Sequence, residues 1–170
     1  MRSTTKRSAI ALFGLALTGS LISFTASAYT PADAAPAVAA KPLAGFMLAS
    51  NMNNRCLTVA GANNLPGAAL YMADCAGSPS QRWYFIGNQL HSDVSPNYCL
   101  DVAWNNHDIG AAVQLWNCVG GDAQTWNWSG PKLQNANGNV LDISHSNSGN
   151  GAAVQMWNPG DSASQDWHMS

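Results

Sequence analysis

The chain has 170 residues, and only 9% of them are charged, whereas an ordinary soluble domain has about 25%. Lys and Arg number 7 and acidic residues 9, all of them aspartates, which gives a formal net charge of -2. Nucleic-acid binding needs clustered Lys and Arg, so the composition excludes a polyphosphate partner. With 7 Trp and a polar surface of Asn, Gln, Ser and Asp, the composition favours a neutral, hydroxyl-rich ligand.

The N-terminal segment 1–28 has the three parts of a secretory signal peptide. They are the basic residues Arg2, Lys6 and Arg7, the mainly apolar run 9–24, and the small residues Ala26-Ser27-Ala28. A membrane anchor is the alternative, but the apolar run is shorter than the ~20 residues that span a bilayer. Residues 29–44 are rich in Ala and Pro, which predicts an extended linker. We therefore expect a protein secreted to the extracellular space or the periplasm.

Residues 45–170 contain one pattern three times. Three different motifs recur, and each does so at the same spacings of 43 and 41 residues. The motifs are Gln81-Arg82-Trp83, Gln124-Thr125-Trp126 and Gln165-Asp166-Trp167; Cys56-Leu57-Thr58-Val59, Cys99-Leu100-Asp101-Val102 and Val140-Leu141-Asp142-Ile143; and Gly67-Ala68-Ala69, Gly110-Ala111-Ala112 and Gly151-Ala152-Ala153. This agreement predicts one domain of three repeats, at about 45–87, 88–130 and 131–170.

Each repeat is predicted to contain four short strands separated by Gly, Asn, Ser and Pro turns. In the second repeat we expect them near Gln89–Ser92, Cys99–Val102, Val113–Asn117 and Thr125–Ser129. No segment shows a sustained helical period. A β-sandwich could be built from such strands, and a β-propeller needs more than three blades. The threefold repeat instead favours an all-β fold, a β-trefoil of three four-strand repeats with pseudo-threefold symmetry.

The cysteines support the same alignment of the repeats. Cys56 and Cys75 lie in the first repeat and Cys99 and Cys118 in the second, each pair 19 residues apart. The third repeat has Val140 and Pro159 at these positions, so both partners are lost together. This paired loss predicts one disulfide within each of the first two repeats, as an exported protein permits. Zinc is the alternative, but no Cys-x-x-Cys spacing supports it.

The Gln-x-Trp motifs, with Cys-Leu-Asp-Val at 99–102 and Gly-x-x-Val-Gln-Leu-Trp-x-Cys at 110–118, resemble those of the ricin-type β-trefoil lectins and of the related carbohydrate-binding modules of family thirteen. The resemblance covers about residues 45–170. It implies carbohydrate binding, with pockets built from the Asp of the second strand, the Gln and aromatic residue of the third strand, and the Gln of Gln-x-Trp.

Strand alternation agrees with most of these positions. If Val113 and Leu115 face the core, Gln114 and Trp116 face outward. An outward indole can act as a platform for the C–H face of a sugar, and an Asp can accept hydrogen bonds from two hydroxyls. The alternatives are a Trp covered by a loop and an Asp that caps its own turn. The candidate carbohydrate-binding residues are Asp101, Gln114, Trp116 and Gln124 in the second repeat and Asp142, Gln155, Trp157 and Gln165 in the third, with Gln124 and Gln165 resting on the resemblance alone.

The chain departs from the family pattern directly before each Gln-x-Trp motif. The family often has a sugar-contacting Asn there, and this chain has Ser80, Ala123 and Ser164. We include Asn117 and Asn158 among the candidate carbohydrate-binding residues because they could compensate. In the first repeat Thr58 replaces the Asp and Ala73 the aromatic residue, so this repeat is predicted to be structural.

Three further expectations concern single side chains. Trp83, Trp126 and Trp167 of the Gln-x-Trp motifs are expected in the core. Trp104 and His145 occupy equivalent loop positions, where they either flank the pockets or lie in a solvated loop. Asn127 belongs to a glycosylation sequon, but we expect its strand to be buried.

The sequence thus predicts a secreted lectin or free-standing carbohydrate-binding module, whose partners are galactosides or plant or cell-surface polysaccharides. One alternative is a trefoil interaction protein such as a protease inhibitor, and another is the glycan-targeting subunit of a separately encoded toxin or hydrolase. Catalysis is not expected, because glycoside hydrolysis needs two carboxyls roughly 5 to 10 Å apart and Asp101 and Asp142 belong to different repeats. Neither a cofactor nor a metal is expected, since the histidines lack metal-ligand spacing.

Overall fold

The computed structural model describes residues 45–170, so the predicted signal peptide (1–28) and linker (29–44) lie outside the described residues. The strands are β1 Phe46–Ser50, β2 Cys56–Val59, β3 Ala68–Ala73 and β4 Arg82–Ile86; β5 Gln89–Ser92, β6 Tyr98–Val102, β7 Val113–Asn117 and β8 Trp126–Ser129; and β9 Lys132–Asn135, β10 Val140–Ile143, β11 Val154–Trp157 and β12 Trp167–Met169. Each predicted repeat therefore contains four strands. Over residues 45–170 no helix is long and apolar enough to cross a membrane.

Short 3-10 turns stand at equivalent places in the three repeats. One turn follows the second strand of each repeat, and another precedes the fourth strand. The turns are η1 Ala60–Ala62, η2 Pro79–Gln81, η3 Ala103–Asn105, η4 Asp122–Gln124, η5 Ser144–Ser146 and η6 Ala163–Gln165. The second of each pair contains the Gln of Gln-x-Trp, so this Gln sits in a turn and not in the strand that carries its Trp.

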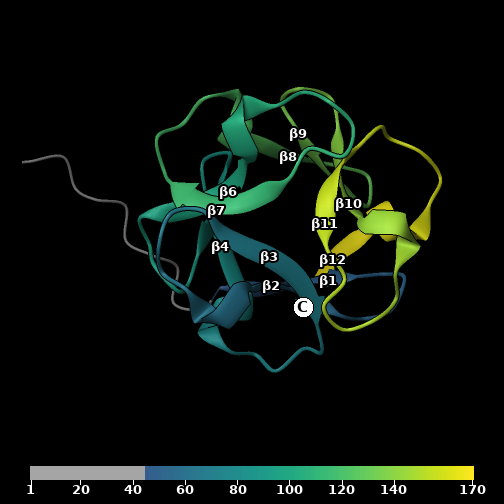
Figure 1. Ribbon diagram of the computed structural model, residues 1–170, viewed down its shortest axis with the longest axis horizontal. Coiled ribbons are helices and arrows are strands. Elements are labelled where there is room, and N and C mark those ends of the chain that lie inside the picture. The colour runs from purple at the N-terminus through teal and green to yellow at the C-terminus, as the bar shows by residue number, and fades with distance from the viewer. Residues whose placement is uncertain (1–44) are drawn as a thin grey trace, which may run out of the picture. The chain divides into compact units, whose positions relative to one another are not determined.

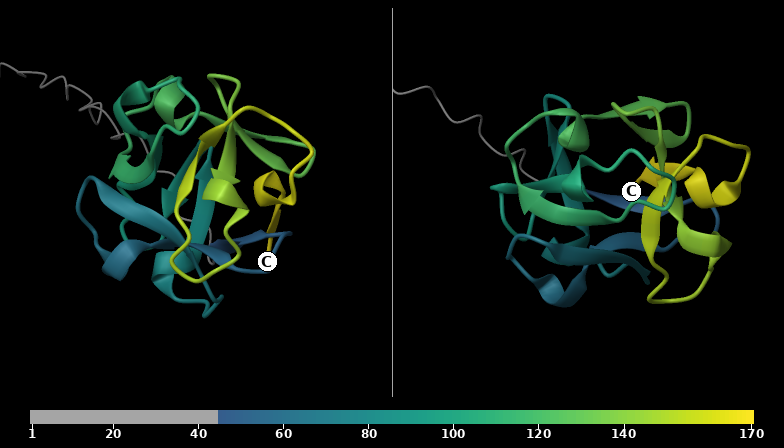
Figure 2. Two further views of the ribbon diagram at one scale, coloured as in Figure 1. Left: turned by 45° about the vertical axis from the view of Figure 1, so that its right-hand side comes forward. Right: turned by 45° about the horizontal axis from the view of Figure 1, so that its top comes forward.

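The strands are arranged around a common centre. The second and third strands of each repeat form the antiparallel hairpins β2–β3, β6–β7 and β10–β11, which Figure 1 shows as three neighbouring units. Strand β3 pairs with β7, and isolated bridges join Tyr71 to Ala153 and Ala112 to Gln155. Strand β1 pairs with β12, so the first and last strands lie side by side (Figure 2). This arrangement agrees with the predicted threefold fold.

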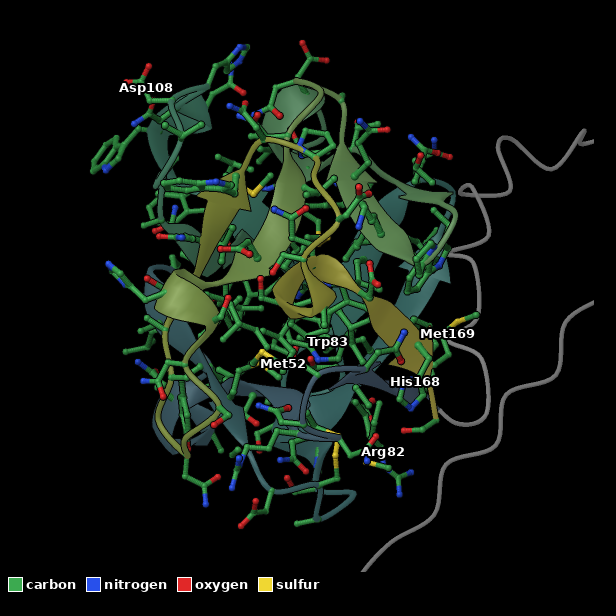
Figure 3. All side chains as sticks on the ribbon, turned by 90° about the vertical axis from the view of Figure 1, so that its right-hand side faces the viewer. Met52, Arg82, Trp83, Asp108, His168 and Met169 are labelled. Atoms are coloured by element: carbon green, nitrogen blue, oxygen red, sulfur yellow. A yellow bond between two sulfur atoms is a disulfide. The ribbon has the colours of Figure 1, made fainter. Side chains whose placement is uncertain are left out.

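The three tryptophans of the Gln-x-Trp motifs lie in the core, as predicted. Trp83, Trp126 and Trp167 are almost completely buried, and Figure 3 shows Trp83 among the side chains of the interior. Each indole Nε1 donates a hydrogen bond to a backbone oxygen of the second strand in its own repeat. The acceptors are Leu57, Leu100 and Leu141, at 3.2, 3.0 and 3.0 Å. Because the same bond recurs three times, these indoles fix the second strand of every repeat on one shared core.

Both predicted disulfides are present, Cys56–Cys75 and Cys99–Cys118. Within residues 45–170 one group has a geometry that could hold a metal ion, His91 with the sulfurs of Cys99 and Cys118. These two sulfurs are joined to each other and are not free thiolates, which are the form that binds metal. The cysteines therefore act as crosslinks between the second strand of a repeat and the segment after its third strand.

The sequon residue Asn127 lies in β8, but its side chain is exposed. Strand alternation turns Trp126 inward and Asn127 outward, and Asn127 Oδ1 accepts a hydrogen bond from Asn88 Nδ2 at 2.8 Å. The expectation that this strand buries the sequon side chain is therefore wrong.

Candidate functional site

The second repeat brings Asp101 and Gln114 together on neighbouring strands. Asp101 in β6 is directly opposite Gln114 in β7, and Gln114 Nε2 donates to Asp101 Oδ1 at 2.9 Å. The carboxylate is recessed, with 6% of the residue exposed, whereas alternation alone predicts an outward side chain. Burial raises the pKa of the Asp101 carboxyl above its ordinary value, although the hydrogen bonds from Gln114 and Gln124 act in the opposite direction.

Gln124 lies behind this carboxylate and is fully buried. Its Nε2 donates to Asp101 Oδ2 at 3.0 Å and to the backbone oxygen of Asn117 at 2.7 Å. Its Oε1 accepts hydrogen bonds from the backbone N–H of Val119, the backbone N–H of Gly120 and the side chain of Gln89. Every polar atom of Gln124 therefore has a protein partner, and one of its hydrogen bonds holds the Asp101 carboxylate in place.

The third repeat repeats the Asp–Gln pair but holds it differently. Gln155 Nε2 donates to Asp142 Oδ2 at 2.9 Å, while the Ser164 hydroxyl donates to Asp142 Oδ1 at 2.7 Å. Gln165, the equivalent of Gln124, is also buried but donates to the backbone oxygen of Asn158 at 3.0 Å. Ser164, which stands where the family often has Asn, thus takes the role that Gln124 has in the second repeat. Sequence reasoning noted this serine only as a departure from the pattern.

A tryptophan stands beside each carboxylate at the surface. Trp116 is 37% exposed and Trp157 is 39% exposed, so each indole has a covered edge and a free area. Trp116 lies across from Cys99 in the β6–β7 hairpin, and Trp157 lies across from Val140 in the β10–β11 hairpin. The outward orientation of both rings was predicted from alternation, and the structure agrees with it.

The pocket of the second repeat has a volume of about 240 Å³. Its lining residues are Asp101, Trp104, Asn105, Gln114, Trp116, Val119, Gly120 and Ala123. Asn117, which was predicted to help bind sugar, is exposed and is not among them. Ala123 brings no polar group to the position where the family often has Asn, which leaves this pocket with a carboxylate floor and largely apolar walls.

The pocket of the third repeat is larger, about 470 Å³, and more polar. The predicted residues Asp142, Gln155, Trp157, Asn158 and Gln165 all line it, together with His145, Ser146, Pro159, Gly160, Asp161, Ser162 and Ser164. Most of the residues that were not predicted belong to the loop between β11 and β12. That loop has the same place as the loop of Val119 and Gly120 in the second repeat, and the equal spacing of the motifs is the signal that could have located both.

The first repeat has the same β-hairpin as the other two but lacks their carboxylate and their outward tryptophan. Thr58 stands opposite Tyr71 in the β2–β3 hairpin, and Gln81 Nε2 donates to Thr58 Oγ1 at 3.0 Å. The glutamine therefore keeps its positioning contact although the carboxylate is replaced by a hydroxyl. Ala73 provides no aromatic platform. Nearby, Arg55 forms a hydrogen-bonded ion pair with Asp74 at 3.0 Å and donates to the backbone oxygen of Ser148, which links the first repeat to the third.

Comparisons with known proteins agree with this fold. A designed threefold-symmetric protein, ThreeFoil, has a TM-score of 0.68 and 24% identity, covering 73% of this chain and 96% of that one. The C-half of an earthworm R-type lectin, solved with GalNAc, has a TM-score of 0.63 and 20% identity, covering 75% and 98%. The β-trefoil lectin of a Vibrio vulnificus hemolysin/cytolysin, solved with N-acetyl-D-lactosamine, has a TM-score of 0.60 and 24% identity, covering 76% and 96%.

A search of curated proteins gave no match. The family model described as a ricin-type beta-trefoil lectin domain matches residues 44–167, which is nearly all of the described domain. This match, the threefold fold and the repeated Asp–Gln pairs agree with the resemblance seen in the sequence. The chain therefore belongs to the family of ricin-type β-trefoil lectin domains.

Proposed function

We propose that this protein is a secreted lectin or free-standing carbohydrate-binding module that binds neutral glycans in the pockets of the second and third repeats. The observation that carries the proposal is a recessed Asp–Gln pair beside a half-exposed Trp, present in both repeats and lost in the first. A folding role alone does not require this combination, because the first repeat folds with Thr58 and Ala73 at the same positions.

Each carboxylate retains acceptor capacity toward its pocket. A carboxylate oxygen can accept about two hydrogen bonds. Each oxygen of Asp101 accepts one, from Gln114 or Gln124, and each oxygen of Asp142 accepts one, from Gln155 or Ser164. The remaining lone pairs can accept from two hydroxyls of a sugar ring, and charge-assisted bonds of this kind are stronger than neutral ones.

The indoles provide the second half of the proposed recognition. A pyranose ring has one face of C–H groups, and covering the free area of Trp116 or Trp157 with that face removes apolar surface from water. Hydroxyls at the ring edge then lie toward the carboxylate. Gln124 and Gln165 contribute by positioning, the first through Asp101 and the second through the loop that carries Asn158. This assignment replaces the direct sugar contact that the resemblance implied for them.

Galactosides are the first ligands to test, followed by plant and cell-surface polysaccharides. The relatives solved with GalNAc and N-acetyl-D-lactosamine motivate this order. Secretion is proposed from the signal sequence and from the two disulfides, which persist in oxidising compartments. N-terminal sequencing of the exported protein is expected to start at Tyr29. Co-purification from the producing cells would reveal a separately encoded toxin or hydrolase subunit.

A glycan array tests the proposed function. The mature chain is expected to bind neutral glycans, and the double variant Trp116→Ala/Trp157→Ala is expected to bind none of them while still melting cooperatively. Absence of binding by the wild-type chain to every neutral glycan would contradict the proposal. Full binding by the double variant would show that the ligand lies elsewhere on the domain.

The raised pKa of Asp101 predicts that acid weakens sugar binding in the second repeat. As the pH falls through that pKa, protonation removes an ionised acceptor, so affinity declines at a higher pH than an ordinary aspartate would require. Stability changes in the opposite sense. Because the folded-state pKa lies above the unfolded one, the ionised group costs stability at neutral pH, and this cost is relieved as the pH falls.

Titration calorimetry on Trp157→Ala, which isolates the second-repeat pocket, measures this effect between about pH 7 and about pH 4. Melting curves at each pH show whether the domain stays folded. An affinity that stays constant over this range in a folded protein would contradict the role given to the ionised carboxylate.

A further inference from the structure

The second-repeat pocket has a feature that neither the fold nor the proposed single-ring site explains. Trp104 in η3 lines the rim of this pocket and is 94% exposed. An indole with so little covered surface gains almost nothing from packing, since hydrophobic stabilisation is proportional to the apolar area removed from water. Trp104 therefore does not stabilise the fold through its ring.

The backbone at Trp104 is also unfavourable for tryptophan. Its φ is 60°, in the left-handed region, where residues with a Cβ are strained and Gly is favoured. The equivalent residue of the first repeat is Gly61, with φ 61°. The second repeat thus has a bulky aromatic residue where the first, which lacks the carboxylate and the platform, has the residue that the backbone prefers. Strained positions of this kind concentrate at functional sites.

The turn that carries Trp104 is fixed by hydrogen bonds. Ala103 N–H donates to Ala112 O at 2.9 Å, and Asn106 N–H donates to Ala103 O at 3.1 Å. The loop that continues from this turn is held from the third repeat, because Asn139 Nδ2 donates to His107 O at 2.9 Å. Figure 3 shows Asp108 of the same loop at the outer edge of the domain. The indole is therefore presented on an anchored turn beside the pocket, which lowers the entropy cost of using it to bind a ligand.

We propose that Trp104 forms a second sugar subsite, so that the second-repeat pocket binds two linked rings of a neutral saccharide. One ring lies on Trp116 with its hydroxyls on Asp101, and the next ring covers the indole of Trp104. The inference rests on the proposed function and adds that the ligand of this pocket is at least two sugar rings long. Both indoles line this one pocket, together with Val119 and Ala123.

The third-repeat pocket provides a contrast within the same chain. Its equivalent residue is His145, also left-handed with φ 56°, and the ring Nδ1 lies 2.8 Å from the Ser144 hydroxyl. Asp161 and Ser162 complete a polar rim there. The third-repeat pocket therefore has one indole, that of Trp157, and we expect the preference for a second ring to be confined to the second repeat.

Calorimetry on Trp157→Ala, in which the second-repeat pocket is isolated, tests the subsite. The probes are galactose, paired with lactose and with N-acetyl-D-lactosamine, which both end in galactose, and xylose, paired with xylobiose. Covering about 60 Å² of the Trp104 indole corresponds to about a tenfold gain in affinity. We expect the best-bound disaccharide to bind about tenfold more tightly than its monosaccharide. Trp104→Gly is expected to abolish this gain, so that the disaccharide and its monosaccharide bind with about equal affinity.

The Gly variant also controls for folding. It places in the second repeat the residue that the first repeat has in Gly61, so its melting temperature is expected to equal or exceed that of the parent. Leu65→Ala is the matched control, since Leu65 is an exposed apolar residue of the first repeat that lines neither pocket, and it is expected to keep the tenfold gain.

Two results overturn the inference and leave the proposed function intact. One is a disaccharide gain that survives Trp104→Gly, and the other is a parent that binds monosaccharides and disaccharides equally. Absence of all sugar binding by the Trp157→Ala parent would contradict both the inference and the proposed second-repeat site.

Discussion

Replacing Trp126 by Ala is expected to cost about 3 to 5 kcal/mol of folding free energy. The indole is almost completely buried, and its Nε1 donates to Leu100 O at 3.0 Å. The variant loses the packing of the ring, leaves a cavity in the shared core and leaves the Leu100 carbonyl without this donor. Domains of this size have a total stability of about 5 to 15 kcal/mol, so the variant is expected to be badly weakened or unfolded.

Trp116→Ala is the matched control, because it removes the same ring from the surface of the same repeat. With 37% of Trp116 exposed, its loss is expected to cost less stability than the loss of the buried Trp126 while abolishing sugar binding in the second repeat. Denaturant unfolding and glycan binding are measured on both variants. A collapsed Trp116→Ala beside a normally stable Trp126→Ala would reverse the inward and outward assignment, and the sugar site would be lost with it.

Removing one pocket is expected to weaken binding to a polymeric glycan far more than binding to a small sugar. Two weak sites on one chain can engage one polymer, and linking two sites raises overall affinity by about 10² to 10⁴ where the geometry allows both to bind. Trp116→Ala and Trp157→Ala each leave one site. Each is expected to lose most of this gain.

Surface-bound polysaccharide and the matching monosaccharide are the two ligands for this comparison. The expected result is a loss of about 10² or more on the polymer, with the affinity of the remaining site for monosaccharide unchanged. Losses of equal size on the two ligands would show that the pockets do not act together. Leu65→Ala, which changes an exposed residue outside both pockets, is expected to behave as the wild-type chain.

The fold could be predicted because the same three motifs occur once in each of three repeats. Three motifs at equal spacings place twelve strands, and the joint loss of both cysteine positions at Val140 and Pro159 predicts the two disulfides that are present. Alternation also places Trp116 outward and Trp126 inward. Each of these inferences needs only the period of a strand and the comparison of one repeat with another.

The burial of the Asp101 carboxylate could not be predicted from the alternation of side chains along a strand. Alternation says on which side of a strand Asp101 lies, but it does not say that a neighbouring loop covers the carboxylate. Gln124 sits in a 3-10 turn and reaches Asp101 across 23 residues of sequence, a contact that no local pattern describes. Its equivalent Gln165 does not make this bond, since Ser164 replaces it. In the second and third repeats the same motif thus has different partners, because Ser164 donates to the carboxylate where Ala123 has no donor.

For a related reason, the sequence did not decide whether the residues at the rim of each pocket take part in the site. Trp104 and His145 are equivalent in sequence, and loops of this kind are either solvated or part of a site. The left-handed backbone at both residues is set by the turn and not by their side chains, so composition gives no sign of it. Only the structure shows that a strained, exposed indole lines the rim of a pocket in one repeat.

The number of sugar sites per chain tests the account most directly. Titration calorimetry with the best monosaccharide from the array gives this number for the wild-type chain, Trp116→Ala, Trp157→Ala and the double variant. Two sites, one, one and none are expected, each on a chain that melts cooperatively. A second site that persists in Trp116→Ala, or a single site in the wild-type chain that neither substitution removes, would contradict the assignment of sugar binding to the second and third repeats.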